Sequence, residues 1–362
     1  MNHKIRIMQI IDSLSIGGAE RVSVNYANAI FEQGYKSFHC TTREEGMLKE
    51  FLDEGVETFF MGKKSLLDVS SYARLIKYVK KNQISILHAH STSFLTAIIV
   101  KIFTGAKIVW HDHYGHSENI NERPIFALKI ASLFFSYIVS VNHILKEWSI
   151  RNLLISSSRI EYVPNYADLK FDETVPNIPG VIGKRIVVLA NLRPQKDHLT
   201  MLKAYSLVLK KGYEDWHVLF VGRDWDDDYS KEIKAYIKNN HMQKSVSVLG
   251  GRSDTAQILK HCDIGVLSSE SEGLPVALLE YALASLAVIS TNVGECSAVL
   301  DNGQVGLLVE SKDEEALSFA LEKLMQEDTD LNEQGNRFFE HVKRHYSKES
   351  IIKAMLKRYE EL

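Results

Sequence analysis

Two glutamates eight residues apart, Glu272 and Glu280, have the most informative spacing in this sequence. Pro275 lies between them and suits the first position of a helix, so we expect Glu272 in a loop and Glu280 in the second helical turn. Backbone amides at Gly273 and Leu274 would then face an anion such as a phosphate, and the carboxylates would accept hydrogen bonds from sugar hydroxyls. Alternatively, Glu272 only caps the helix and Glu280 lies on a solvated face, although an unpaired charge among so many apolar residues is costly.

A cationic turn precedes another predicted helix. Residues 190–198 link a predicted strand to that helix and include Asn191, Arg193 and Lys196. A guanidinium group offers a planar fork and an ammonium group a point charge, and both suit a diphosphate. The alternative is a solvated basic turn without a ligand.

A glycine pair follows the first predicted strand. Gly17 and Gly18 open directly into a predicted helix, where glycine lets the backbone approach a ligand and the free amides favour an anion. The pair lacks the G-x-G-x-x-G pattern, and the second predicted strand, residues 36–41, does not end in an acidic residue, which argues against a dinucleotide-dependent dehydrogenase. A plain strand-to-helix turn is the alternative.

Histidines cluster at the expected ends of two further strands. Imidazole groups there can hydrogen-bond a sugar hydroxyl or exchange a proton near neutral pH. A metal site is a rival interpretation, but neither an H-E-x-x-H motif nor a cysteine pair supports it, so we expect no metal. A purely structural role is the third possibility. The residues concerned are His88, His90, His111, Asp112, His113 and His116.

The composition is that of a globular protein with two domains. The chain has 362 residues, of which 45% are hydrophobic and 25% charged, and its net charge is −3, so nucleic acid is not an expected partner. The three cysteines are odd in number and lack a C-x-x-C spacing, which argues against a disulfide framework and fits a reducing cytoplasm. Charges near the N-terminus argue against an export signal, so we expect a cytoplasmic protein.

Short β-branched runs alternate with segments of helical length in both halves of the chain. This alternation predicts two doubly wound parallel α/β domains. Prolines and glycines interrupt it at residues 165–184, so we place an N-terminal domain at 1–170, a C-terminal domain at 171–345 and a last helix, 346–362, that packs back on the N-terminal domain. Ligands of such sheets bind outside the carboxyl ends of the strands, so the site is expected there.

The chain resembles the retaining glycosyltransferases of family 4, also called group 1, which have the GT-B fold of two facing Rossmann-like domains. The resemblance spans nearly the whole length and is carried by the glycine pair, the strand ending at His113, the turn at 192–196 and, above all, the E-x7-E pair. It implies that Glu272 contacts the donor sugar and Glu280 the nucleotide ribose. Lys196 would neutralise the donor diphosphate, and His113 would lie near the sugar.

The resemblance implies roles for less distinctive positions as well. Gly17 and Gly18 would approach the diphosphate or the acceptor, and Arg252 would contact the base. The implied donor site also includes Gly273, Leu274 and Pro275.

Two positions depart from the family pattern. Where the family usually has Gly-Arg-Leu, this chain has Ala190-Asn191-Leu192, so we hypothesise that Arg193 reaches the phosphate instead and that Asn191 lies in the donor site. Ala298 replaces a usual glutamate, which leaves the identity of the donor open.

We therefore predict a retaining, metal-independent hexosyltransferase that needs no cofactor and uses a nucleotide sugar as substrate. The donor is expected to be a UDP-sugar rather than a GDP-sugar, and the acceptor a glycan or polyprenyl-linked glycan of cell-surface polysaccharide synthesis. A sugar-nucleotide epimerase on the same fold and a catalytically inactive binding or scaffold subunit are the alternatives. A basic amphipathic segment at residues 63–81 would allow a peripheral contact with the inner face of the cell membrane, unless it is only a sheet-covering helix with a solvated face.

Overall fold

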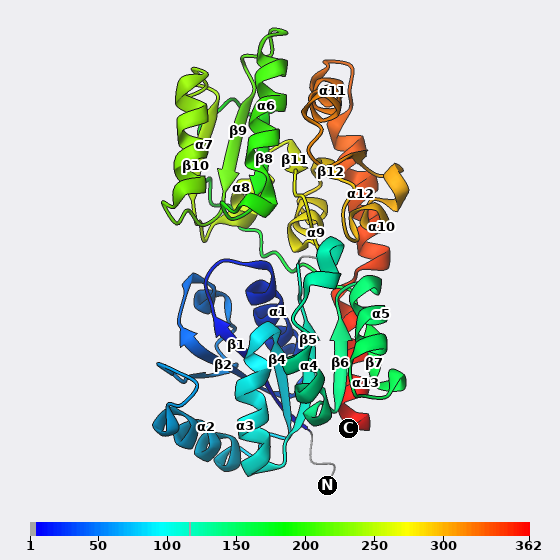
Figure 1. Ribbon diagram of the computed structural model, residues 1–362. Helices are drawn as coiled ribbons and strands as arrows, with labels where there is room; N and C mark the ends of the chain where they lie inside the picture. The colour runs from blue at the N-terminus through cyan, green and yellow to red at the C-terminus, as the bar shows by residue number, and fades with distance from the viewer. Residues whose placement is uncertain (1–4, 116) are drawn as a thin grey trace. The chain divides into compact units, whose positions relative to one another are not determined.

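The computed structural model describes residues 5–115 and 117–362 (Figure 1). The chain divides into two compact units: residues 1–166 with 348–362 form the N-terminal unit, and residues 167–347 form the C-terminal unit. The last helix, α13 (Lys348–Glu361), belongs to the N-terminal unit and packs on its first helix, α1 (Gly18–Glu32). The sequence places the corresponding boundaries after residue 170 and before residue 346.

The N-terminal unit is built on a seven-stranded sheet in which every strand runs parallel to its neighbours. The strand order β3-β2-β1-β4-β5-β6-β7 reverses between β1 and β4, and ligands of open parallel sheets bind at such a reversal. The strands are β1 (Arg6–Ser13), β2 (Lys36–Glu44), β3 (Glu57–Phe60), β4 (Ile86–His90), β5 (Lys107–Asp112), β6 (Tyr137–Ser140) and β7 (Ile160–Tyr162).

The two faces of this sheet differ in chemistry, because successive strand residues point to opposite sides. The remaining helices of the unit are α2 (Val69–Lys81), α3 (Phe94–Thr104), α4 (Phe126–Ala131) and α5 (His143–Asn152). They cover an apolar face, where Met8 and Leu87 share one hydrophobic cluster with Leu75 of α2. Helices α1 and α13 cover a polar face, where Tyr26 of α1 and Tyr359 of α13 contact the ring of His88.

The C-terminal unit repeats this plan with a six-stranded parallel sheet in the order β10-β9-β8-β11-β12-β13. Its strands are β8 (Arg185–Leu189), β9 (His217–Val221), β10 (Val246–Gly250), β11 (Ile264–Leu267), β12 (Ala287–Thr291) and β13 (Leu307–Val309). Its helices are α6 (His198–Leu209), α7 (Asp228–Asn239), α8 (Thr255–Lys260), α9 (Val276–Leu283), α10 (Cys296–Val299), α11 (Glu314–Met325) and α12 (Leu331–His345).

The predicted fold class, two parallel α/β units, is confirmed. One strand end was predicted wrongly: β2 extends beyond residue 41 and ends at Glu44, which pairs with Ser13 across an irregularity in β1. The end of β2 is therefore acidic and does not count against a dinucleotide-dependent dehydrogenase. Among the helices in the described parts of the chain, none combines the length and hydrophobicity needed to cross a bilayer.

Candidate active site

The glycine pair lies where the first strand of the N-terminal unit leads into its first helix. Gly17 is the N-cap residue of α1, with an extended backbone, and Gly18 is the first helical residue. Gly18 is exposed, and a Cβ atom placed there would have no described atom within 4 Å. The loop therefore leaves open space beside Gly18, as the approach of a phosphate or hydroxyl group requires. Beside Gly17 a Cβ atom would lie 2.3 Å from a carboxylate oxygen of Glu20, so a ligand there would have to displace that side chain.

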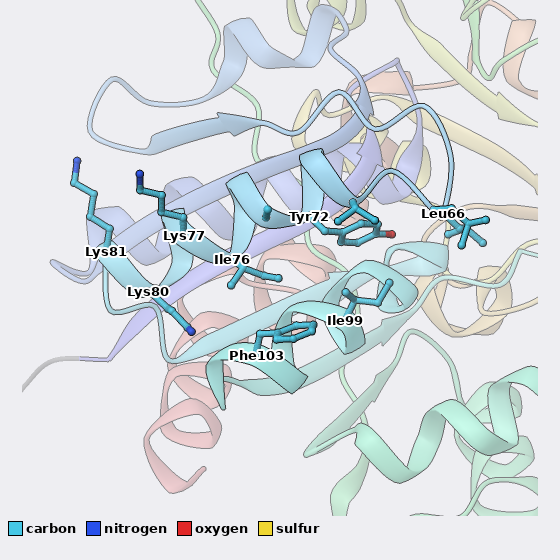
Figure 2. A pocket seen from close by; sticks show the side chains of 11 residues that line it. Leu66, Tyr72, Ile76, Lys77, Lys80, Lys81, Ile99 and Phe103 are labelled. Carbon is cyan, nitrogen blue, oxygen red and sulfur yellow. The ribbon is translucent and has the colours of Figure 1, made fainter.

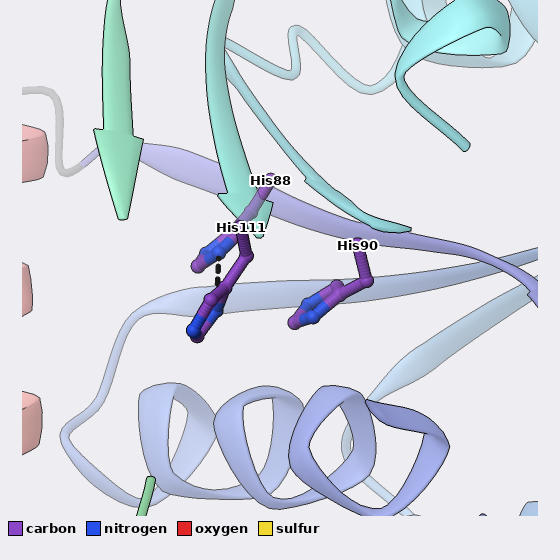
Figure 3. A group of neighbouring side chains, drawn as sticks. All are labelled: His88, His90 and His111. Carbon is purple, nitrogen blue, oxygen red and sulfur yellow. Dashed lines mark hydrogen bonds between the residues drawn. The ribbon is translucent and has the colours of Figure 1, made fainter. Parts of the chain in front are cut away.

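Four histidines of β4 and β5 stack on the polar face of the same sheet. Nε2 of His88 lies 3.1 Å from Nδ1 of His111, and Nδ1 of His90 lies 2.9 Å from Nε2 of His113, the residue directly after β5. Nε2 of His90 also lies 2.8 Å from Oε1 of Gln9 on β1. Figure 3 shows His88, His90 and His111 projecting from their strands toward α1. The structure thus brings the predicted histidines into one group.

Burial keeps these imidazoles neutral. His88, His90 and His111 are completely buried; burial lowers the pKa of His88 to about 3 and holds the pKa values of His90 and His111 well below the usual range. His113 remains partly exposed, and desolvation lowers its pKa to about 3. Of the two roles considered for His113, hydrogen bonding to a sugar hydroxyl therefore fits better than proton exchange near neutral pH.

Gln9 and His90 orient His113. When the carbonyl oxygen of Gln9 accepts from Nε2–H of His90, Nδ1 of His90 must accept from Nε2–H of His113, which leaves the lone pair of His113 on Nδ1. The sequence analysis missed Gln9. The sequence pattern of β1 could have indicated Gln9, because this residue is polar and lies between the apolar Met8 and Ile10 in a buried strand.

A metal interpretation of this group is weaker than a structural one. Ring nitrogens of His88, His90 and His111 lie within 4.8 Å of one another, close enough for one ion. A metal would have to displace the hydrogen bond between His88 and His111, and the group consists of neutral histidines without a carboxylate to balance a buried dication. His116, which the sequence analysis included, lies outside the described residues.

Asp112 at the end of β5 is bound by an arginine that the sequence analysis did not single out. Its carboxylate accepts hydrogen bonds from both terminal nitrogens of Arg123, at 2.7 and 2.8 Å, and both side chains are almost fully buried. The guanidinium group also lies over the rings of Tyr114 and Trp148. This bidentate pair anchors the chain around His113. No local pattern predicts it, because Asp112 ends β5 and Arg123 lies 11 residues further along the chain.

In the C-terminal unit, the loops that follow β8 and β11 are joined at the carboxyl edge of the sheet. Nζ of Lys196 lies 2.6 Å from Oε1 of Glu272, and the hydroxyl group of Ser269 donates to the same oxygen at 2.6 Å. The backbone amide of Glu270 donates to the carbonyl group of Gln195 at 2.8 Å. Lys196 and Glu272, which the resemblance assigns to the same nucleotide-sugar donor, are therefore in direct contact.

A glycine in a third loop sets the position of Glu272. Gly294 has a φ of +54°, and a Cβ atom there would lie 2.3 Å from the carbonyl oxygen of Glu272 and 2.7 Å from that of Gly273. The amide of Glu295 donates to the carbonyl group of Gly273 at 3.0 Å. Only glycine combines this backbone conformation with so close an approach. The sequence analysis missed this role, because the neighbour of Gly294 belongs to a distant loop.

Helix α9 begins directly after the Glu272 loop. Pro275 is its N-cap residue and Val276 its first helical residue, so the expectation that Pro275 occupies the first helical position was wrong by one residue. Its ψ of 116° is extended, and the helical conformation starts only afterwards. Glu280 lies in the second turn and is 6% exposed. The solvated-face alternative for Glu280 is therefore excluded, and no side chain caps α9 in the described structure.

Asn191 and Arg193 support the loop after β8 through contacts of their own. Oδ1 of Asn191 accepts from the backbone amide of Arg223 at 2.7 Å. The guanidinium group of Arg193 lies 4.7 Å from the ring centre of Trp225 and is exposed. The backbone amide of Lys196 donates to the carbonyl group of Arg193 at 2.9 Å. The two cationic side chains have separate partners, because that of Lys196 pairs with Glu272 and that of Arg193 lies over Trp225.

Arg252 forms an ion pair with Asp254, two residues further along the chain. Its guanidinium group donates to both carboxylate oxygens of Asp254, at 2.7 and 2.6 Å. These hydrogen bonds raise the pKa of Arg252 further. The predicted contact of Arg252 with a base remains a prediction.

Comparisons with known proteins identify the family of the chain. A family model described as "Glycosyltransferase Family 4" matches residues 16–171, and one described as "Glycosyl transferases group 1" matches residues 181–341. The chain is 27% identical over 346 residues to the UDP-Gal:alpha-D-GlcNAc-diphosphoundecaprenol alpha-1,3-galactosyltransferase of Escherichia coli, covering 88% of this chain and 87% of that protein. It is 22% identical to the N-acetyl-alpha-D-glucosaminyl L-malate synthase of Bacillus anthracis, covering 93% and 92% of the two chains.

Solved structures share the fold. Anabaena HepE in complex with UDP-glucose superposes with a TM-score of 0.80 at 16% identity, covering 99% of this chain and 100% of HepE. Staphylococcus aureus TarM superposes with a TM-score of 0.78 at 13% identity, covering 98% and 99%. The fold is therefore GT-B. With both family models matched in succession along the chain, the protein belongs to the group 1 glycosyltransferases of family 4 and is a glycosyltransferase.

Proposed function

We propose that this enzyme transfers a sugar from a UDP-sugar to a lipid-linked glycan in cell-surface polysaccharide synthesis, with retention of the anomeric configuration. The observation that carries the proposal is the contact of 2.6 Å between Lys196 and Glu272 at the start of α9. The comparisons support it, because the E. coli relative is named for a UDP-Gal donor and a diphosphoundecaprenol-linked acceptor. HepE was solved with UDP-glucose. A lipid-linked acceptor also brings the enzyme to a membrane surface.

Lys196 supplies positive charge for the leaving diphosphate in this proposal. Its side chain is 23% exposed, against 7% for Glu272, so the ammonium group is accessible while its partner is buried. The backbone at Gly273, Leu274 and Pro275 leads into α9, whose N-terminal dipole favours an anion. Fixed charge and helix dipole together stabilise the departing phosphate, so we propose a reaction without a metal or cofactor.

The two glutamates recognise hydroxyl groups of the donor. We assign Glu272 to the donor sugar and Glu280 to the ribose. Both carboxylates are buried, at 5% and 6% exposure, and hydrogen bonds from hydroxyl groups are stronger in such surroundings than in water. Asn191 and Arg193 are proposed to contact the diphosphate, and Arg252 is proposed to contact the base. On donor binding, Arg193 would leave the ring of Trp225 and Arg252 would leave the carboxylate of Asp254.

The N-terminal unit contributes the remaining proposed contacts. Neutral His113 hydrogen-bonds near the transferring sugar, held by His90 and Gln9. The backbone at Gly17 and Gly18 approaches the diphosphate or the acceptor, through the open space beside Gly18.

The proposed chemistry is a front-face displacement. The acceptor oxygen bonds to the anomeric carbon on the side from which the diphosphate leaves, and the bond between that carbon and the diphosphate oxygen breaks. A leaving phosphate oxygen takes the acceptor proton, so the products are a glycoside and UDP. No enzyme nucleophile takes part, in contrast to retaining glycosidases. The protein contributes by positioning both substrates and by stabilising the leaving charge.

Calorimetry with UDP, GDP and UDP-glucose tests the donor site. We expect UDP to bind and GDP to bind at least about tenfold more weakly. Glu280→Gln is expected to weaken UDP binding about tenfold, because it replaces a hydrogen bond to a charged group. Glu322→Gln removes a carboxylate of α11 that pairs with Lys211 at 2.6 Å, and serves as the matched control. The donor assignment is refuted if neither nucleotide binds or if Glu280→Gln binds UDP as the wild type does.

Turnover with UDP-galactose, UDP-glucose and UDP-N-acetylglucosamine and an undecaprenyl-diphosphate-linked sugar tests the reaction. NMR should show an α-glycoside from the α-linked donor, formed equally well in EDTA; a β-glycoside would refute retention. Glu272→Gln and Lys196→Met should each lower kcat about 100-fold. Conversion of the UDP-sugar without an acceptor would instead identify an epimerase.

A further inference from the structure

The N-terminal unit exposes large apolar side chains on the outer surface of α2, α3 and α4, here called the α2–α4 face. Helix α2 packs against α3 and α3 against α4, so the three helices form one continuous surface (Figure 1). Leu67 is 86% exposed, Phe103 57% and Phe126 77%. The face also includes the exposed side chains of Val69, Leu95, Ile102 and Ile130 on these helices. Leu66 and Leu67, shortly before α2, and Leu133, shortly after α4, are counted with it. Exposed apolar surface of this extent marks an interaction site.

A groove between α2 and α3 lies within this face. Its volume is about 950 Å³. Figure 2 shows Ile76 of α2 opposite Ile99 and Phe103 of α3, with Lys80 directed toward the same end as Phe103 and Leu66 at the other end. The groove therefore combines an apolar lining with lysines at one end, which suits contact with a surface that is apolar inside and charged outside.

The charges of the α2–α4 face are predominantly positive. Helices α2, α3 and α4 contain lysine and arginine but neither aspartate nor glutamate. Lys77, Lys80, Lys81 and Lys129 are exposed, and none has an ion-pair partner in the described part of the chain. Asp68, directly before α2, is an acidic exception that serves as the N-cap of that helix. The face is therefore complementary to an anionic surface.

This face differs from the amphipathic segment expected at residues 63–81. Lys63 is buried, with its ammonium group 3.2 Å from Asp12 and 2.7 Å from Thr96, so it does not belong to the surface. Leu75 faces the core, and Arg74 donates to a backbone carbonyl group at 2.8 Å. The exposed apolar residues come largely from α3 and α4, which only tertiary packing places beside α2.

We propose that the α2–α4 face docks on a lipid bilayer containing anionic headgroups. The exposed apolar side chains enter the interfacial region, and the unpaired lysines contact the headgroups. Lysine is depleted from protein–protein interfaces, whereas here lysines lie among the apolar residues, so a bilayer fits this face better than a protein partner. The inference rests on the lipid-linked acceptor of the proposed function, because such an acceptor is reached only at a membrane.

Flotation of the full-length protein with vesicles tests the proposal. Vesicles of phosphatidylcholine with about one third phosphatidylglycerol are compared with vesicles of phosphatidylcholine alone. Each lysine near an anionic surface contributes about fivefold to binding, so the triple variant Lys77→Gln, Lys80→Gln, Lys81→Gln should bind anionic vesicles roughly 100-fold more weakly at low salt. High salt should remove this difference by screening.

A second variant tests the apolar part. Leu67→Ser with Phe103→Ser should weaken binding at both low and high salt, because burial of apolar area is not screened by ions. The matched control combines Lys238→Gln on α7 with Phe319→Ser on α11, both exposed residues of the C-terminal unit, and should bind as the wild type does.

Three results would overturn the docking surface: no flotation with anionic vesicles, equal binding by all variants, or a change only in oligomeric mass, which would identify a contact between copies of the chain. Calorimetry with UDP on the same preparations separates this failure from failure of the proposed function. If the wild type binds UDP but does not float with the vesicles, only the docking surface is rejected. If the wild type does not bind UDP, the proposed donor site is rejected.

Discussion

Acidification is expected to destabilise the N-terminal unit much more than the C-terminal unit. His39, His88, His90 and His111 are at most 1% exposed in the N-terminal unit. Burial lowers the pKa values of His39 and His88 to about 3 and those of His90 and His111 well below the usual range. In the unfolded chain histidine titrates near pH 6.5. Between these values the unfolded state binds protons that the native state does not.

The sign and size of the effect follow from this difference. Stability is complete above about pH 6.5 and falls as the pH drops toward the folded-state values. From pH 7 to 5.5 each such histidine costs about 1.2 kcal/mol, and any folded-state pKa below about 4.5 gives nearly the same result. These four histidines together cost about 5 kcal/mol, and His113, whose pKa desolvation also lowers to about 3, adds about 1.2 kcal/mol. The total is comparable to the whole stability of a domain. In the C-terminal unit, burial lowers the pKa of His198 to about 4, which costs about 1.2 kcal/mol over the same range. Burial also lowers the pKa of His217, so this histidine adds to the loss in the same direction.

Hydrogen exchange measured by mass spectrometry resolves the two units. Peptides from β4 and β5 report on the N-terminal unit and peptides from β8 on the C-terminal unit, after correction for the pH dependence of intrinsic exchange. His39→Gln should reduce the pH-dependent loss in β4 and β5 by about 1.2 kcal/mol, whereas His345→Gln, at an exposed position of α12, should not. Equal losses in the two units, or a loss below about 2 kcal/mol in β4 and β5, would refute a neutral, buried histidine stack.

Two further substitutions test the supports of the site. Gly294→Ala should destabilise the C-terminal unit in urea by more than about 2 kcal/mol and lower turnover, because its Cβ atom would lie 2.3 Å from the carbonyl oxygen of Glu272. Gly212→Ala, at a positive φ with no described atom within 4 Å, should cost only about 1 kcal/mol; equal costs would contradict the close contact at Gly294. Arg123→Gln should destabilise the N-terminal unit by about 3 kcal/mol, because it leaves the buried carboxylate of Asp112 unpaired, and Arg123→Lys should fall in between. Wild-type stability of Arg123→Gln in urea would show that the pair does not anchor this loop.

Elements with a local signal were predictable. The β-branched runs of β1 and β8 predict buried parallel strands, and a glycine or proline indicates the loops at Gly17 and Pro275. The place of Glu280 in the second turn of α9 follows from helical geometry, which depends only on neighbours in the chain. Errors at such places were small, as in the single-residue shift at Pro275.

Features that depend on distant neighbours were not predictable. The contact between Lys196 and Glu272 requires two strands to lie side by side, and the need for glycine at position 294 exists only because another loop passes within van der Waals distance. Lys63 looks like a surface cation in the sequence, yet it is buried against Asp12 of another strand.

The sequence by itself determined which segments become strands and helices and which loops carry carboxylates, cations and glycines, because these properties are set by short-range sterics and hydrophobic periodicity. Tertiary structure alone decided the protonation state of the histidine stack, the pairing of Asp112 with Arg123 and the exposure of the α2–α4 face. Burial and electrostatic partners are properties of the packed chain, since residues far apart in sequence remove water from one another only when the sheet has formed.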